Sequence, residues 1–406
     1  MQNLDRRADI FYMCMLILLL GICLAFVAGN LATKTKPKDC CKTIGCYYTI
    51  SLPNDDRGLL VKDIDIHLCS HMFYTYVGIN SSGLVEVAEP YTDIEHRGYT
   101  DFNNLRQKNP NLKTLAAMQV VDENYIQNIN NKPLIDPKLR QKLVNSIVSF
   151  VKKYGFNGVD IDYSDPPPQD KKPEDKTNFV YFLKALRERF DKEHLILTVK
   201  VDSNEKNAEV LYDIKGISTY AHFINLKAYD FHREYQKEKN VGHPAPLLHS
   251  PKENSMEGKK NIDYVVQYWI KNHADPNKIL IGTSFKGASY SLADPSHFTR
   301  GSPISQERGE YDQAASYGLI CDHIKKWSYY FDNEQKVPYV HSRNQVIAYD
   351  DERSIKEKAI YARDHHLGGA MVDNMEDDDF GARCGKKFPL MKALDEILRN
   401  KCSAVA

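Results

Sequence analysis

The sequence lacks several features that mark large classes of protein. Its 406 residues include 54 Lys and Arg against 54 Asp and Glu, so the net charge is zero and no basic field favours nucleic acid. No predicted strand is followed by a glycine-rich phosphate loop, which argues against a dinucleotide-binding open sheet. The cysteines show neither C-x-x-C spacing nor a nearby pair of histidines, so no zinc site is expected. No cofactor motif is present, and we expect no cofactor.

The N-terminus contains a long segment without charge. Residues 10–33 are uncharged and follow Arg6 and Arg7. This length suits one membrane span, which needs ~20 apolar residues, and small residues near its end also permit a signal-peptidase cut. We therefore expect residues 1–33 to be a cleaved signal peptide or an uncleaved signal anchor, followed by a linker over residues 34–43. Both alternatives place the rest of the chain outside the cytosol, secreted or anchored by this one segment.

Seven cysteines follow this segment, and an oxidising compartment usually joins such a set in disulfides. They are Cys40, Cys41, Cys46, Cys69, Cys321, Cys384 and Cys402. Because the number is odd, one thiol is left over or pairs with another chain. Asn80 begins the tripeptide Asn-Ser-Ser, a candidate glycan acceptor if the chain is exported.

Eight apolar or β-branched runs alternate with helical patterns. The runs lie near Ile44–Ile50, Leu68–Ile79, Leu112–Val121, Gly155–Asp162, Leu195–Val201, His222–Tyr229, Lys278–Phe285 and Leu367–Asp373. One helix is especially clear, because Asp136 and Pro137 form an N-cap and first turn, and apolar residues recur at i+4 up to Val151. Strands alternating with helices predict an α/β fold of the (β/α)8 TIM-barrel type. A doubly wound open sheet is the alternative.

The seventh and eighth strands are separated by a longer stretch. Residues 287–346 are rich in Tyr, Gly, Ser and Pro and exceed the length of one crossover connection. We interpret them as a small inserted α+β subdomain, so that the barrel comprises residues 44–286 and 347–400. The first strand of a barrel begins, and the last helix ends, on the same face. Cys402 should therefore approach Cys40 and Cys41 and pair with one of them.

The fourth predicted strand carries acidic residues where such barrels hold their functional groups, at the carboxyl end. It reads N-G-V-D-I-D-Y-S from Asn157 to Ser164. Side chains alternate along a strand, so Asp160, Asp162 and Ser164 all point into the barrel. Two inward carboxyl groups require shared hydrogen bonds or a raised pKa on one of them.

With this motif the chain resembles glycoside hydrolase family 18, the chitinases and chitinase-like proteins, whose fourth-strand pattern is D-G-x-D-x-D-W-E. The resemblance covers residues 45–400 and includes C-Y-Y in the first strand, A-Y-D-F-H in the sixth and G-G-A-M-V in the eighth. It also implies two disulfides, Cys46–Cys69 and Cys321–Cys384.

The reaction of this family needs a carboxylic acid at the last motif position to protonate the glycosidic oxygen, while the sugar's own acetamido oxygen attacks. By the resemblance, Asp162 and Tyr229 match the positions that orient the acetamido group, and Asp160 supports them. Ser164 stands at the acid's position, where a hydroxyl is too weak an acid and too short. General acid catalysis contributes about 10²–10⁴-fold, so its loss leaves little activity. Asp165 follows, but strand alternation aims it away from the cleft.

Aromatic rings are also scarce where the resemblance implies a sugar cleft. Chitin-type sugars bind largely by stacking, yet the chain has only two tryptophans. We expect Trp269 to pack within a helix, whereas Trp327 suits packing or sugar binding. At three tryptophan positions of the family the chain has Val121, Tyr163 and Asp373. The last replaces the floor of the central subsite with a carboxylate.

Charged residues replace other cleft residues of the family. Lys286 stands where the family usually has tyrosine, Ala288 where it usually has arginine, and Lys227 where it usually has an apolar residue. We expect a polar group at the barrel mouth that consists of Lys227, Asp162, Asp230 and Asp373. It is either an unused pocket whose charges neutralise one another or a pocket for a different, charged ligand. The candidate ligand-binding residues are Asp162, Tyr229, Asp230 and Asp373.

Together these features predict a catalytically inactive chitinase-like protein that acts by binding a carbohydrate or protein partner. One alternative is a lectin that still binds N-acetylglucosamine oligomers, which Asp162 and Tyr229 favour. The other is an active chitinase with a non-standard acid, for which Asp165 is the candidate. No nucleic-acid partner is expected.

Overall fold

The computed structural model describes residues 41–50, 58–80, 82–119, 132–164, 172–232, 239–311 and 314–399. The chain divides into residues 1–41 and 42–406, so every described residue except Cys41 belongs to the second unit. The predicted signal or anchor segment lies outside the described residues. Within the described part, no helix combines the length and the apolar character that a membrane span requires.

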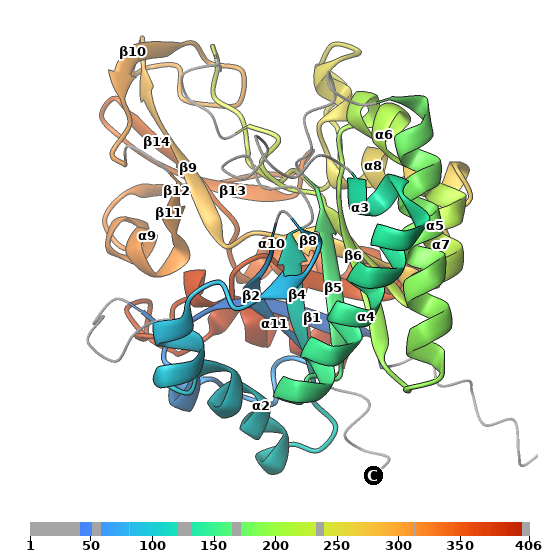
Figure 1. Cartoon of the computed structure of the whole chain (residues 1–406). Coiled ribbons are helices and arrows are strands. Elements are labelled where there is room, and N and C mark those ends of the chain that lie inside the picture. The colour runs from blue at the N-terminus through green and yellow to red at the C-terminus, as the bar shows by residue number, and fades with distance from the viewer. Residues whose placement is uncertain are drawn as a thin grey trace, which may run out of the picture. The chain divides into compact units, whose positions relative to one another are not determined.

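The second unit is built on a closed barrel of eight parallel strands, which confirms the predicted fold (Figure 1). Around the barrel the order is β1-β15-β8-β7-β6-β5-β4-β2, and β2 pairs with β1 to close it. The strands are β1 (Thr43–Thr49), β2 (His71–Ile79), β4 (Lys113–Gln119), β5 (Gly158–Tyr163), β6 (Ile196–Asp202), β7 (Phe223–Lys227), β8 (Ile279–Thr283) and β15 (Gly369–Val372). A short strand, β3 (Val85–Glu86), pairs antiparallel with β2.

Helices cover the outside of the barrel strands (Figure 1). They are α2 (Gly98–Lys108), α3 (Lys132–Ile135), α4 (Pro137–Tyr154), α5 (Pro173–Asp191), α6 (Glu205–Leu211), α7 (Ile214–Tyr220), α8 (Ile262–Lys271), α10 (Glu352–Asp364) and α11 (Pro389–Leu398). The helix predicted from its cap is α4: the Asp136 carboxylate accepts hydrogen bonds from two first-turn amides, and Gly155 ends the helix with φ 77°. Its buried residues recur with helical spacing and pack into the core.

An inserted α+β unit connects β8 to the last barrel segment. Its antiparallel sheet has the order β10-β9-β14-β13-β12, with β11 beside β9. The elements are β9 (Lys286–Leu292), β10 (Ile304–Arg308), β11 (Ala315–Ser316), α9 (Tyr317–Ile324), β12 (Ser328–Asp332), β13 (Val337–Ser342) and β14 (Gln345–Ala348). Figure 1 shows this sheet beyond the end of the barrel toward which the strand arrows point.

Both disulfides that the resemblance implies are present. Cys46 in β1 bonds Cys69 just before β2, and Cys321 in α9 bonds Cys384 just before α11. Cys41 is also disulfide-bonded, and its partner is not among the described cysteines. The amide of Lys42 donates to the carbonyl of Leu398 at 3.1 Å, so the start of β1 and the end of α11 are adjacent. Pairing of Cys402 remains a prediction, because Cys402 lies outside the described residues.

Candidate functional site

The remnant motif occupies β5 and the residue after it. Its glycine, Gly158, is required by close packing, because a Cβ there would lie 1.9 Å from the carbonyl oxygen of Ile196 in β6. Asp160, Asp162 and Ser164 are 0%, 4% and 2% exposed, as expected for side chains that point into the barrel.

Asp160 is satisfied by three donors from three other strands. Its Oδ2 accepts from the hydroxyl of Tyr47 at 2.5 Å, and its Oδ1 accepts from Thr198 at 2.5 Å and from Asn225 at 2.9 Å. Burial raises the pKa of Asp160 to about 6, although the hydroxyl donors oppose the shift. Asp160 thus joins four strands at the centre of the barrel.

Both carboxylate oxygens of Asp162 interact with other groups of the protein. Its Oδ1 accepts from the hydroxyl of Ser164 at 2.6 Å and from the amide of Ser164 at 3.1 Å. Its Oδ2 accepts from the hydroxyl of Tyr76 at 3.1 Å and lies 3.6 Å from Nζ of Lys200. The hydroxyl at the acid's position therefore donates back to the neighbouring carboxylate.

Lys200 connects the remnant motif to the eighth barrel strand. In the β5–β6 register it stands directly opposite Asp162, and its side chain is 6% exposed. Nζ lies 3.1 Å from Oδ1 of Asp373, which follows β15, and 4.6 Å from the ring centroid of Tyr47. The hydroxyl of Tyr229 donates to the same oxygen of Asp373 at 2.6 Å. We call Asp162, Lys200, Tyr229 and Asp373 the mouth network.

The charges of the mouth network support one another. Burial alone would lower the pKa of Lys200, but Tyr229, Asp373 and Asp162 together raise it well above its usual value. Burial alone would raise the pKa of Asp373, but Lys200 and the Tyr229 hydroxyl hold it below its usual range. An ammonium group thus faces ionised Asp373 at neutral pH. The charged groups of the mouth network are thus paired with one another.

Lys200 was not among the residues expected at the barrel mouth from the sequence. Lys200 lies between Asp162 and Asp373, and Lys227 also lowers the pKa of Asp373. A signal was present, because Lys200 interrupts the apolar run of β6 at an inward position of the alternation.

Lys227 and Asp230 line a cavity beside the mouth network. It has a volume of about 830 Å³, lies at the carboxyl ends of β6 and β7, and is also lined by Tyr229. Asp230 has φ 62°, a left-handed conformation that is uncommon for a residue with a side chain. The cavity adjoins the mouth network through Tyr229.

The other residues expected in the cleft lie in the core, in an ion pair or outside the described residues. Tyr163 is buried against Phe179 of α5, with ring centroids 4.2 Å apart, so it belongs to the core. Trp269 is fully buried in α8, which confirms its packing role, and Trp327 packs partly buried against the core. Lys286 pairs with Asp377 at 3.3 Å. Val121 and Asp165 lie outside the described residues.

One half-buried carboxyl group near the barrel mouth was not anticipated. Glu376 lies in the 3-10 turn Met375–Asp377, and its Oε1 accepts from the amide of Thr49 at the end of β1 at 3.3 Å. Burial raises the pKa of Glu376 to about 8, so this group is largely protonated at neutral pH. It is a second candidate, beside Asp165, for a non-standard acid.

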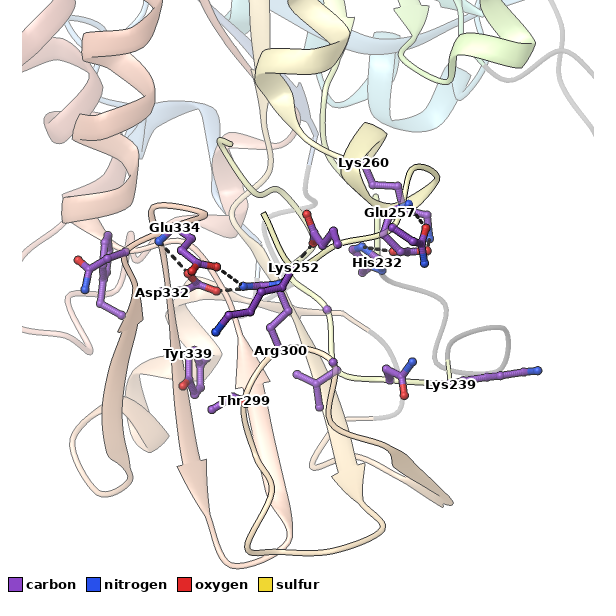
Figure 2. Close-up of a pocket in the computed structure, with 18 residues that line it drawn as sticks. His232, Lys239, Lys252, Glu257, Lys260, Thr299, Arg300, Asp332, Glu334 and Tyr339 are labelled. Carbon is purple, nitrogen blue, oxygen red and sulfur yellow. Dashed lines mark hydrogen bonds and ion pairs between the residues drawn. The ribbon is translucent and has the colours of Figure 1, made fainter. Parts of the chain in front are cut away.

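A larger cavity of about 940 Å³ lies between the β7–α8 connection and the inserted sheet (Figure 2). On one side Arg300 reaches Asp332 at 2.9 Å, Glu334 at 2.8 Å and Glu253 at 3.7 Å. On the other side His232 lies 3.3 Å from Glu257 (Figure 2). Of these four ion pairs, Arg300–Glu253 joins the inserted unit to the β7–α8 connection, whereas the other three lie within one segment.

Asn80 lies in the turn between β2 and β3. Its side-chain oxygen accepts from the amides of Ser82 and Leu84, and its side-chain nitrogen donates to Glu86 at 3.2 Å. Glycosylation of Asn80 remains a prediction.

Comparisons with known proteins agree with the geometry. Residues 43–378 match the model of the family described as glycosyl hydrolases family 18. Mouse chitotriosidase-1 is 30% identical over 351 residues, covering 83% of this chain and 73% of its own length. The Group IV chitinase of Ostrinia furnacalis superimposes with a TM-score of 0.79 at 31% identity, covering 88% of this chain and 99% of its own.

A further solved neighbour is human YKL-39, described as a pseudo-chitinase with retained chitooligosaccharide-binding properties. It superimposes with a TM-score of 0.78 at 27% identity, covering 88% of this chain and 99% of its own. The family thus includes both hydrolases and a protein described as a pseudo-chitinase. By its barrel, its remnant motif and the extent of these matches, the chain belongs to glycoside hydrolase family 18.

Proposed function

We propose that the chain is a non-catalytic member of the chitinase family that acts by binding a carbohydrate or protein partner. The observation that carries this proposal is Ser164 at the position of the family's acid, with its hydroxyl donating to Asp162 at 2.6 Å. A serine hydroxyl has no proton to give near neutral pH, and losing the general acid costs about 10²–10⁴-fold in rate.

The surrounding scaffold supports a retained binding role. The barrel is closed and both disulfides are formed. An intact fold around a defective acid position is what selection for binding, rather than for turnover, would leave. The disulfides also support a location outside the cytosol, secreted or membrane-anchored through the N-terminal segment, because reducing compartments disfavour them.

Turnover of a fluorogenic chitobioside tests the proposal. We expect wild-type activity at least about 10²-fold below that of an active family member assayed in parallel. Activity comparable to that enzyme would refute the proposal, and loss of that activity in Asp165→Asn or in Glu376→Gln would identify the acid. Ser164→Glu alone should not produce robust hydrolysis, because Asp162 is already engaged by Tyr76 and Lys200.

A lectin is the second candidate. The pseudo-chitinase description of YKL-39, and the presence here of Asp162 and Tyr229, favour retained binding of N-acetylglucosamine oligomers. Calorimetric titration with chitotetraose separates the candidates: binding would favour the lectin, and its absence would favour a partner recognised elsewhere.

A further inference from the structure

Lys200 lies against the groups that the family resemblance assigns to the sugar's acetamido group. Its ammonium is 3.6 Å from Asp162, and it shares Oδ1 of Asp373 with the hydroxyl of Tyr229. Asp162 therefore already lies beside the Lys200 ammonium, and Tyr229 is connected to the same ammonium through Asp373.

We propose that Lys200 is the residue that decides what the remnant subsite accepts, because its ammonium is a built-in ligand that excludes N-acetyl sugars. This inference rests on the proposed function in treating the barrel mouth as a binding site rather than a working catalytic centre. It goes further by naming the group that closes the site and the class of ligand that this group excludes.

The geometry explains why a sugar cannot simply displace this ammonium. Lys200 is almost fully buried, and moving it away would leave Asp162 and Asp373 without their shared cation. An acetamido N–H is a neutral donor, and neutral hydrogen bonds to a carboxylate are weaker than those from an ammonium group. The hydrogen bonds of a neutral sugar are thus too weak to replace the internal ion pair.

Asp373 opposes sugar binding for a second reason. By the resemblance it stands where the family has an aromatic floor, and a carboxylate provides no apolar face for the sugar ring. Lys200 and Asp373 act as a unit, since each compensates the charge of the other at 3.1 Å. Removing the pair together should reopen the subsite without leaving either of these two charges buried and unpaired.

The first experiment titrates chitotetraose into three forms of the whole chain by calorimetry. These are the wild type, the double variant Lys200→Ala/Asp373→Ala, and the control Lys358→Ala/Asp350→Ala, which removes another buried ion pair. We expect the first double variant to bind at least about tenfold more tightly than the wild type. The control should bind as the wild type does. No gain in a variant that is folded by circular dichroism would overturn the inference, as would tight binding by the wild type.

A second variant provides an independent test if the double-alanine variant misfolds, and it restores the aromatic residue that the family has at the floor of the central subsite. Lys200→Ala/Asp373→Trp places an aromatic ring where the carboxylate was and frees the space of the lysine stem. It should bind chitotetraose at least as tightly as the double-alanine variant. If neither folded variant binds, Lys200 is not what excludes the sugar.

Chemical rescue tests the same claim through stability. In Lys200→Ala, ethylammonium should raise the melting temperature saturably by filling the vacated place between the carboxylates, whereas tetramethylammonium, which has no N–H donor, should not. The wild type should respond equally to both cations. An identical response of the variant to both cations would contradict the assignment of this place to an ammonium group.

The two proposals fail differently. Hydrolysis of a chitobioside by a reopened variant would refute the proposed absence of an acid and leave the role of Lys200 standing. Absence of any gain in binding would remove the role of Lys200 and leave the proposed function standing.

Discussion

Replacing Lys200 with methionine should destabilise the protein strongly, because it leaves buried carboxylates without their cation. Lys200 is 6% exposed, Asp162 4% and Asp373 17%. Breaking a buried ion pair by removing one partner costs about 3–5 kcal/mol. The hydroxyl groups of Tyr229 and Tyr76 still donate to the two carboxylates, so we expect the lower end of this range, about 3 kcal/mol at pH 7.

The pH dependence of this loss follows from Asp373. In the wild type the folded-state pKa of Asp373 is depressed, so its contribution to stability is present above the unfolded pKa and is lost as the pH falls through the folded value. In the variant burial is no longer opposed by Lys200, so the pKa of Asp373 rises. Protonation then relieves the buried charge in acid, and the difference in stability from the wild type should shrink between pH 7 and about pH 4.5.

Urea unfolding of a double-mutant cycle measures the interaction. Lys200→Met, Asp373→Asn and their combination should give a coupling free energy of about 1.5–3 kcal/mol at pH 7. The cycle Lys386→Met with Glu352→Gln is the control, since that pair is 54% and 38% exposed and should couple by less than about 1 kcal/mol. A Lys200–Asp373 coupling near zero, or equal losses at both pH values, would refute the reasoning.

Two further predictions concern Asp160 and Arg300. The folded-state pKa of Asp160 is raised to about 6, so between pH 4 and 6 the folded protein retains a proton that the unfolded chain has lost. The contribution of Asp160 to the free energy of unfolding should therefore fall by about 3 kcal/mol as the pH rises from about 4 to 6. Urea midpoints of Asp160→Asn should lack this pH dependence, and an unchanged dependence would contradict the assignment. Arg300→Ala leaves three carboxylates without their guanidinium and should cost about 2–3 kcal/mol, less than a fully buried pair because Arg300 is 22% exposed. Thermal melting and limited proteolysis of the inserted unit measure that loss, with the exposed cavity residue Lys239→Ala as the control; equal behaviour of the two variants would show that Arg300 does not fasten the unit.

The sequence predicted best those features of the fold that depend on interactions between near neighbours in the chain. Helix caps, alternation in strands and the spacing of apolar runs predicted the eight barrel strands and α4, because these patterns depend on near neighbours in the chain. The position of Ser164 is equally local, since the chain alone gives its residue type and strand alternation gives its inward direction. The inward positions of Asp160 and Asp162 followed from the same alternation.

The identity of the cation in the mouth network was decided only by the tertiary structure. Lys200 is 38 residues after Asp162 and 173 before Asp373, so the register between β5 and β6 and the closure of the barrel set its partners. Lys227 was an equally reasonable choice from the chain alone, because both lysines belong to predicted strands. Which buried charges meet depends on long-range packing, and that is why the sequence determined the barrel and the inward position of Ser164, while the fold determined which cation contacts Asp162 and Asp373.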